Sequence, residues 1–402
     1  MFRIERPLVE LIVCATIVTV SLLYLLLKTV GNGQQTVDFQ FIWLAGHMWN
    51  QGKSPYSPEY AVLGDAMFTG NRPEYWFYPP NWWPIATLTG LLRYEEAQTV
   101  WRGISGGAVI SGIIILGQAA HQYVTSVSLI RWAALIAFTC LSSSTASAFA
   151  LGQTTPFIFF GMACFVCGYV AKSRIWTVVG LVLMMLKPQV GVVVCAFLLT
   201  SWSGIIAVTL AAAIVLLTAV PALVQAGVMP FLKYFIATLA AHGALPPNAP
   251  HSMTGVRYLV YELGGGNVDV LILTVLACFS AFVLGFVRSR EKHRSAETDA
   301  LDLSILLMII LFFVPLHIYD TFIVAPIIVL MTPLSTLLQW ILGIGLLIIF
   351  RANNLAELTG LDDPETQYSL GVRFMTIAFT IMLGALIVQR GDVGARNTRP
   401  PR

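Results

Sequence analysis

Long apolar runs alternate with short polar connections along most of the chain. Runs that approach or exceed the ~20 residues needed to cross ~30 Å of hydrocarbon occur at residues 8–30, 98–119, 131–149, 204–226, 268–288 and 370–389. Shorter or interrupted apolar runs occur at residues 154–171, 175–199, 301–316, 321–333 and 334–350. Because a backbone in lipid has no water to bond with, such runs form helices. The pattern predicts an all-α polytopic membrane protein.

The amino-acid composition is also typical of a membrane protein. The chain is 57% hydrophobic and 11% charged, whereas about a quarter of the residues in ordinary soluble proteins are charged. The formal net charge of +3 is too small to suggest a nucleic-acid partner. No linker, low-complexity tract or soluble domain interrupts the apolar pattern. We therefore expect residues 1–390 to form one transmembrane domain, followed by a disordered cytoplasmic tail at residues 391–402.

Basic residues near the ends of the runs predict the orientation, because Lys and Arg favour the cytoplasmic side. Four clusters stand out: Arg3 and Arg6, Lys172 and Arg174, Arg288 to Arg294, and the tail from Arg390 onward. Placing all four inside predicts that the first run crosses outward, in a multi-pass protein that we expect in the inner (plasma) membrane. Residues 31–96 then form a large first extracytoplasmic loop. Its stretch 82–92 is too short to cross, and its tryptophans predict a helix at the membrane interface.

The run 175–199 is interrupted at its centre by Lys187 and Pro188. Proline removes one helix hydrogen bond, and placing a charged lysine in the middle of the membrane costs free energy. Two half-helices that enter and return would satisfy both facts if the open backbone faced a polar cavity. A single kinked span is the alternative. Lysines near span ends commonly extend their ammonium to the interface, but Lys187 lies about half a span from either limit, so we favour a functional role or a structural ion pair.

The predicted orientation brings several polar features to the outer face, although only the basic clusters were used to assign it. They are Asp38, Gln153, the loop with Arg257, and the segment "PLHIYD" at residues 315–320. Asp38 either caps the helix that follows it or serves as a general base with a pKa tuned by partial desolvation. We expect a shared site in which Asp38 would be the base.

The remaining candidate residues each have a structural and a functional interpretation. His317, Tyr319 and Asp320 form a structural turn, with Asp320 as a helix cap, or they orient a substrate and its phosphate. The planar guanidinium of Arg257 is suited to binding a phosphate group. A solvated surface arginine without a ligand is the alternative interpretation. Tyr78 belongs to the aromatic segment "EYWFYPPNWW" at 74–83. That segment is an interfacial belt or a platform for a sugar or an isoprenoid.

The chain lacks sequence signatures for bound nucleotides and metals. It has no GxGxxG after a strand, no Walker sequence, no DxD pair and no HExxH. The adjacent Asp362 and Asp363 and the lone pair Cys164 and Cys167 are weak metal signals, because isolated spacings of this kind are common. We expect neither a metal nor a cofactor. Any sugar donor must then be activated without a bound nucleotide or metal, and a sugar linked to a lipid phosphate meets that condition.

An ordered set of short motifs resembles glycosyltransferase family 87. The set comprises an aspartate after the first run, "WLAG" (43–46), "GKSPY" (52–56), "WFYPP" (76–80), "LGQ" (151–153), "LKPQ" (186–189) and "PLHIYD" (315–320). This family includes polyprenol-phosphate-mannose-dependent mannosyltransferases. The resemblance implies a GT-C fold, with a bundle of about ten to twelve transmembrane helices and interfacial helices in the first extracytoplasmic loop.

The resemblance also implies an activity. The enzyme would move a hexose, mannose by resemblance, from a polyprenyl-phosphate sugar to a hydroxyl of a glycolipid or glycan, with inversion. The bilayer, the donor and the acceptor would be its partners. By this resemblance Asp38 would be the catalytic base and His317 would assist. From their charge and placement, we expect Lys187 and Arg257 to bind substrate, together with Gln153, Tyr78, Tyr319 and Asp320. A transporter, a lipid-linked-sugar flippase and a non-catalytic assembly subunit are the alternatives.

Overall fold

The computed structural model describes residues 6–30, 36–69, 72–123, 128–291, 295–358 and 364–397. Within these ranges the regular structure is helical and no strand occurs. Six helical segments are long and apolar enough to cross a membrane: Pro7–Val30, Tyr94–His121, Leu129–Leu151, Trp202–Ala226, Val270–Ser289 and Tyr368–Val393. The prediction of an all-α polytopic membrane protein is confirmed.

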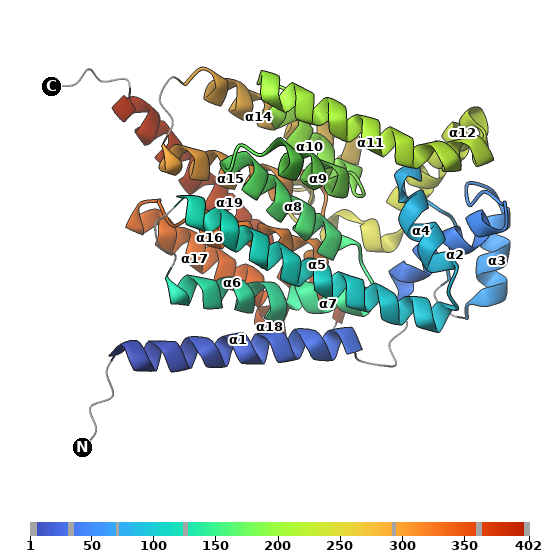
Figure 1. Cartoon of the computed structure of the whole chain (residues 1–402), viewed down its shortest axis with the longest axis horizontal. Helices are drawn as coiled ribbons and strands as arrows, with labels where there is room; N and C mark the ends of the chain where they lie inside the picture. The colour runs from blue at the N-terminus through green and yellow to red at the C-terminus, as the bar shows by residue number, and fades with distance from the viewer. Residues whose placement is uncertain are drawn as a thin grey trace.

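The long helices lie side by side and form the body of the molecule (Figure 1). They are α1 (Arg6–Val30), α5 (Tyr94–Tyr123), α11 (Trp202–Ala226), α14 (Val270–Ser289), α19 (Pro364–Asn397), and the consecutive pair α6 (Leu129–Leu141) and α7 (Ser143–Leu151). Shorter helices pack among them: α8 (Thr155–Val170), α15 (Ala296–Phe313) and α16 (Pro326–Leu330) are mostly buried, whereas α17 (Thr336–Phe350) and α18 (Ala352–Glu357) each have an exposed face. Helix α15 is buried on nearly all sides, and its Asp299 and Asp302 form ion pairs with arginines.

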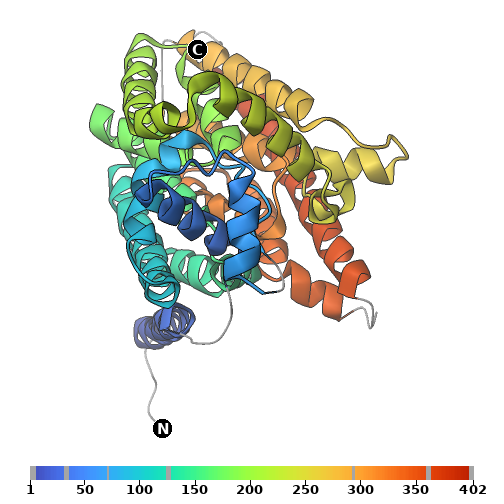
Figure 2. The same cartoon turned by 90° about the vertical axis from the view of Figure 1, so that its right-hand side faces the viewer.

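One end of the bundle carries the helices of two long connections. The first connection contains α2 (Val37–Asn50), α3 (Glu59–Met67), the 3-10 helix η1 (Pro80–Trp82) and α4 (Trp83–Gly90). The second contains α12 (Val228–Gly243), η2 (Pro246–Asn248), η3 (Pro250–Ser252) and α13 (Val256–Glu262). Helices α2, α3, α4 and α12 gather together, and Figure 2 looks directly onto them. We call this the site end.

The interrupted run folds as two half-helices, α9 (Arg174–Met184) and α10 (Pro188–Leu198). The ring of Tyr169, just before α9, lies 5.7 Å from the ring of Phe197 near the end of α10. The start of α9 and the end of α10 are therefore at the same end of the bundle. The prediction of half-helices that enter and return is confirmed, and the single kinked span was wrong.

Two other expectations need correction. Helix α19 continues to Asn397, so residues 391–397 are helical and not part of a disordered tail. The run 321–333 is divided between the 3-10 helix η4 (Ile318–Val324) and the five-residue α16. Several residues named or included in the ranges above lie outside the described residues: Arg3, Lys292, Arg294, Asp362, Asp363, Arg399 and Arg402.

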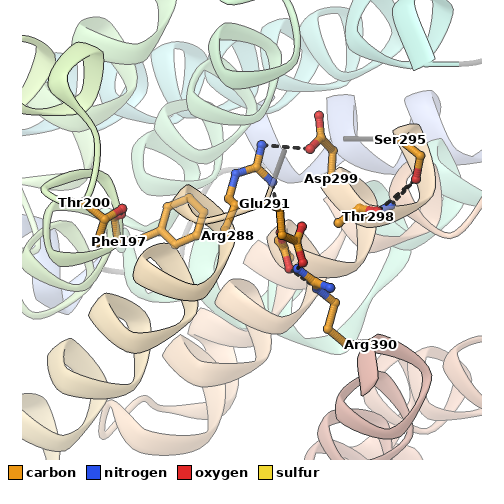
Figure 3. A network of polar contacts seen from close by, with 9 residues as sticks. Phe197, Thr200, Arg288, Glu291, Ser295, Thr298, Asp299 and Arg390 are labelled. Carbon is orange, nitrogen blue, oxygen red and sulfur yellow. Dashed lines mark hydrogen bonds and ion pairs between the residues drawn. The ribbon is translucent and has the colours of Figure 1, made fainter. Parts of the chain in front are cut away.

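The end opposite the site end is held by an ion-pair network that we call the arginine cluster (Figure 3). Its members come from α14, its C-terminal flank, α15 and α19: Arg288, Glu291, Asp299, Asp302 and Arg390. Asp302 is fully buried and receives Arg288 Nη1 at 3.0 Å and Arg390 Nε at 2.7 Å. Arg288 also contacts Asp299 at 2.8 Å, and Arg390 pairs with Glu291. The network fixes three helices together, because a buried charge is tolerated only when paired.

Candidate functional site

Asp38 is carried into the molecule by helix α2. The helix begins after Thr36 with Asp38 in its first turn, where the helix dipole favours a negative charge. Its glycine Gly46 touches α4, since a Cβ there would lie 1.7 Å from the Ala86 carbonyl oxygen. The small residue in "WLAG" thus lets the two helices cross closely. Asp38 does not cap α2, and its carboxylate instead accepts a hydrogen bond from the amide of Gln153.

Gln153 reaches Asp38 because α7 ends in a left-handed turn. Gly152 has φ +73°, which glycine adopts without strain, and a Cβ there would lie 2.6 Å from Thr36. The Gly152 carbonyl accepts a hydrogen bond from Trp101 Nε1 at 3.0 Å. This arrangement explains the "LGQ" motif, in which glycine makes the turn and glutamine follows it to the carboxylate.

Lys187 lies at the break between α9 and α10. Pro188 begins α10, a position where proline's missing N–H costs nothing. The first connection covers the break and satisfies two open carbonyls: Asn81 Nδ2 donates to Met185 at 3.2 Å, and Trp82 Nε1 donates to Leu186 at 2.9 Å. The aromatic segment thus has a structural role at this point.

Asp320 accepts hydrogen bonds from three directions. Lys187 Nζ lies 2.5 Å from Oδ1, and Thr155 Oγ1 donates to the same oxygen at 2.6 Å. The other oxygen accepts the His317 backbone N–H at 3.3 Å and so caps η4. Asp320 is buried, with 1% of its surface exposed. The interpretation of Asp320 as a helix cap is confirmed, and the structure adds an ion pair with Lys187. Its role toward a substrate stays a prediction.

The second connection brings His317 and Arg257 to the same region. The Thr254 backbone N–H donates to the Leu316 carbonyl at 2.8 Å, which fixes the connection beside the "PLHIYD" segment. His317 Nε2 is 3.0 Å from Asn248 Oδ1. Arg257 is buried and donates to Asn267 Oδ1 from Nη2 at 2.9 Å. Its Nη1 is also buried and has no hydrogen-bond partner among the described residues.

Two tyrosines lie beside the charged groups. The Tyr319 ring stacks on His317 at 4.9 Å, and Lys187 Nζ lies 5.7 Å from its centroid. Burial raises the pKa of Tyr78, and the nearby charges of Asp38 and Asp320 act in the same direction. Tyr78 is therefore protonated at neutral pH, so that its hydroxyl can donate a hydrogen bond.

The electrostatics separate the roles of the acid and the imidazole. Burial raises the pKa of Asp38 from 3.8 to about 6, against the opposing effects of Gln153 and Lys187. Burial lowers the pKa of His317 to about 4, with Asp320 opposing and the Lys187 charge adding to the decrease. At neutral pH Asp38 is an ionised base of moderate strength, and His317 is a neutral hydrogen-bonding group.

All eight residues singled out in the sequence lie in one neighbourhood at the site end. Asp38, Gln153, Lys187, Tyr78, His317 and Tyr319 come from five separate segments, and five of the six are half-buried, whereas Gln153 is buried. The arrangement combines a carboxylate base with hydrogen-bond donors and cations that suit a departing phosphate. The role of each residue stays a prediction.

Three residues of this region were missed in the sequence. Thr155 donates to Asp320, Asn248 contacts His317, and His242 in α12 adds a second imidazole. Thr155 follows the "LGQ" motif by two positions, so that motif was a signal for it. Asn248 and His242 gave no signal, because nothing local indicates that their connection folds back over the site.

Comparison with known proteins decides the family. The sequence model of glycosyltransferase family 87 matches residues 76–316, which is more than half of the chain. The chain belongs to glycosyltransferase family 87. No curated protein matches it. The resemblance drawn from the motifs is thereby confirmed, and the protein is a membrane glycosyltransferase.

The family 87 match covers part of the site directly. Tyr78, Gln153, Lys187 and Arg257 lie within the matched residues, whereas Asp38 and His317 lie outside them. The structure places Asp38 in hydrogen-bond contact with Gln153. The His317 backbone N–H donates a hydrogen bond to Asp320, and Asp320 forms an ion pair with Lys187. The two predicted catalytic groups are thus tied by contacts to residues of the family 87 match.

Proposed function

We propose that this family 87 enzyme transfers a hexose, mannose in our expectation, from a polyprenyl-phosphate donor to a hydroxyl of a glycolipid or glycan. The observation that carries the proposal is the ionisable carboxylate of Asp38 in the same buried neighbourhood as Lys187, His317 and Arg257. A base and several phosphate-binding groups are what sugar transfer from a phosphate donor requires.

The reaction proceeds by direct displacement. The acceptor oxygen attacks the anomeric carbon while its proton passes to the carboxylate of Asp38. The bond from that carbon to the phosphate oxygen breaks, and the electron pair leaves with the phosphate. Attack opposite the leaving group inverts the configuration, so an equatorial donor phosphate gives an axial product.

The phosphate is held by groups with free hydrogen-bonding capacity. The buried Nη1 of Arg257 has no partner among the described residues, and an unpaired buried donor is costly until a ligand accepts its bond. Lys187 contributes positive charge, while its pairing with Asp320 keeps the ammonium in place. Neutral His317 donates or accepts a hydrogen bond at the phosphate or at the acceptor.

We further propose that the site end faces the outside of the cell. The basic residues Lys172, Arg174, Arg288 and Arg290 flank α8, α9 and α14 at the end opposite the site, and such residues favour the cytoplasm. A donor anchored in the bilayer by its polyprenyl chain would then meet an acceptor hydroxyl at the outer surface.

The test uses purified protein in liposomes with radiolabelled polyprenyl-phosphate mannose and a total lipid extract as the source of acceptors. The wild type should transfer label to a new glycolipid, and Asp38→Asn should lower the rate by about a hundredfold to ten-thousandfold. Label that crosses the liposome membrane without any glycosylated product would contradict the proposal and favour a transporter. Full activity of Asp38→Asn would remove Asp38 as the base.

A further inference from the structure

His242 is placed at the site end by α12 and held there by its backbone. It lies in the last turn of the helix, and its carbonyl oxygen accepts a hydrogen bond from Asn248 Nδ2 at 2.6 Å. Asn248 in turn contacts His317 Nε2. The second connection therefore links the two histidines through a single asparagine.

The imidazole of His242 is packed against the aromatic segment of the first connection. Its ring stacks on Phe77 with centroids 3.8 Å apart and an interplanar angle of 14°. Phe77 stacks in turn on Tyr78 at 4.5 Å, and Tyr78 is close enough to Asp38 and Asp320 to be affected by their charges. The contacts form a row of rings that runs from His242 to the charged groups of the site.

One nitrogen of this imidazole is left unused. His242 Nδ1 is buried and has no hydrogen-bond partner among the described residues. Buried polar atoms are nearly always satisfied, so each exception calls for an explanation. A ligand that supplies the missing partner is such an explanation, because the ring is stacked on Phe77, which is itself stacked on Tyr78 of the site.

The charge state of the imidazole indicates what kind of ligand fits. Burial lowers the pKa of His242 to about 4, and the nearby His317 and Lys187 act in the same direction. The ring is thus neutral under physiological conditions, with one N–H donor and one nitrogen acceptor. A sugar hydroxyl both donates and accepts, whereas a phosphate diester only accepts, so the ring is better matched to a sugar than to the phosphate.

We infer that His242, stacked on Phe77, hydrogen-bonds a hydroxyl of the transferred hexose through Nδ1 and so contributes to recognition of the sugar. This inference rests on the proposed function, because it assumes a polyprenyl-phosphate sugar as donor. His242 is a specificity-determining residue and takes no part in proton transfer at Asp38.

The experiment measures binding of two probes to the purified protein in detergent: a short-chain prenyl phosphate, and the same prenyl phosphate carrying mannose. The bare probe is a phosphate monoester and the mannose probe is a diester, so each probe is compared between variant and wild type, which cancels the difference in phosphate charge. His242→Phe keeps the stacking surface and removes the nitrogens. It should weaken binding of the mannose probe by about threefold to tenfold, the worth of one hydrogen bond, and leave binding of the bare phosphate unchanged.

Two further variants separate the two ring nitrogens. The amide of His242→Asn lies near the position of Nδ1 and should restore most of the affinity for the mannose probe. The amide of His242→Gln reaches the position of Nε2 and should restore less. If His242→Phe weakens both probes equally, or neither, the inference is overturned. If the wild type binds both probes equally and transfers no sugar from polyprenyl-phosphate mannose, the proposed function fails; if it transfers sugar while His242→Phe leaves both probes unchanged, only this inference fails.

Discussion

Two groups of buried charges lie at opposite ends of the bundle, and they are built differently. In the arginine cluster, Asp302 is 0% exposed and each of its oxygens accepts a bond from an arginine. At the site end, Asp38 is half-buried and bonded by the neutral amide of Gln153. Among the described residues, no cationic nitrogen lies within salt-bridge distance of Asp38.

The difference separates a structural role from a chemical one. A carboxylate that accepts bonds from two arginines has its charge compensated by opposite charges within the fold. Removing a carboxylate from water without such partners costs free energy in its ionised form. For Asp38 this cost raises the pKa to about 6, a value suited to a general base. Proteins accept such costs at functional sites. Neutralising one carboxylate in each region should therefore have opposite effects.

The largest effect is expected from Asp302→Asn. The change leaves Arg288 and Arg390 without their shared buried partner, and breaking a buried pair typically costs about 3–5 kcal/mol of stability. The thermal unfolding midpoint in detergent should fall steeply, while any folded fraction should transfer sugar at the normal rate per molecule. An unchanged midpoint would show that the arginine cluster does not hold α14, α15 and α19 together.

A smaller effect of opposite sign is expected from Asp38→Asn. The folded pKa of Asp38 lies above its ordinary value, so the ionised form destabilises the fold, and this cost develops as the pH rises from about 4 to about 6. The variant removes the cost and keeps an oxygen that can accept the bond from Gln153. At neutral pH its stability should rise by up to about 3 kcal/mol, because one pKa unit corresponds to about 1.4 kcal/mol.

Repeating the melting experiment at low pH provides a control for the role of the Asp38 charge. Below about pH 4 the carboxyl is protonated in both folded and unfolded states, so wild type and Asp38→Asn should melt alike there. A variant that is less stable than the wild type at neutral pH would mean that the Asp38 charge supports the fold. The contrast with Asp302 would then disappear.

Much of this arrangement could be predicted from short motifs because each one has a local physical reason. The run interrupted by Lys187 and Pro188 predicted half-helices, since proline and a mid-membrane lysine disfavour a continuous span. The glycine of "LGQ" marked a turn, and Gly152 has the positive φ that this requires. Basic residues near the run ends predicted that Asp38 and Asp320 would share one end of the bundle.

What escaped prediction depends on chain segments that approach each other only after folding. Trp82 satisfies a carbonyl of the broken helix 104 positions away. His242 meets Phe77, and Asn248 meets His317. Phe77 and Trp82 lie in the aromatic segment and His317 lies in "PLHIYD", but nothing local to these motifs indicates which distant residues they contact. Likewise, helix α19 continues past residue 391 although the sequence there resembles a polar tail.

The most direct test of the account is the pH dependence of kcat/KM for sugar transfer by the wild-type enzyme. A general base must be ionised, and the pKa of Asp38 is about 6. The rate should be constant above neutral pH and fall about tenfold for each unit below pH 6. The donor is a phosphate diester that stays ionised throughout, and His317, with a pKa of about 4, titrates lower. A profile that stays flat from pH 5 to pH 8 would contradict the assignment of Asp38 as the base.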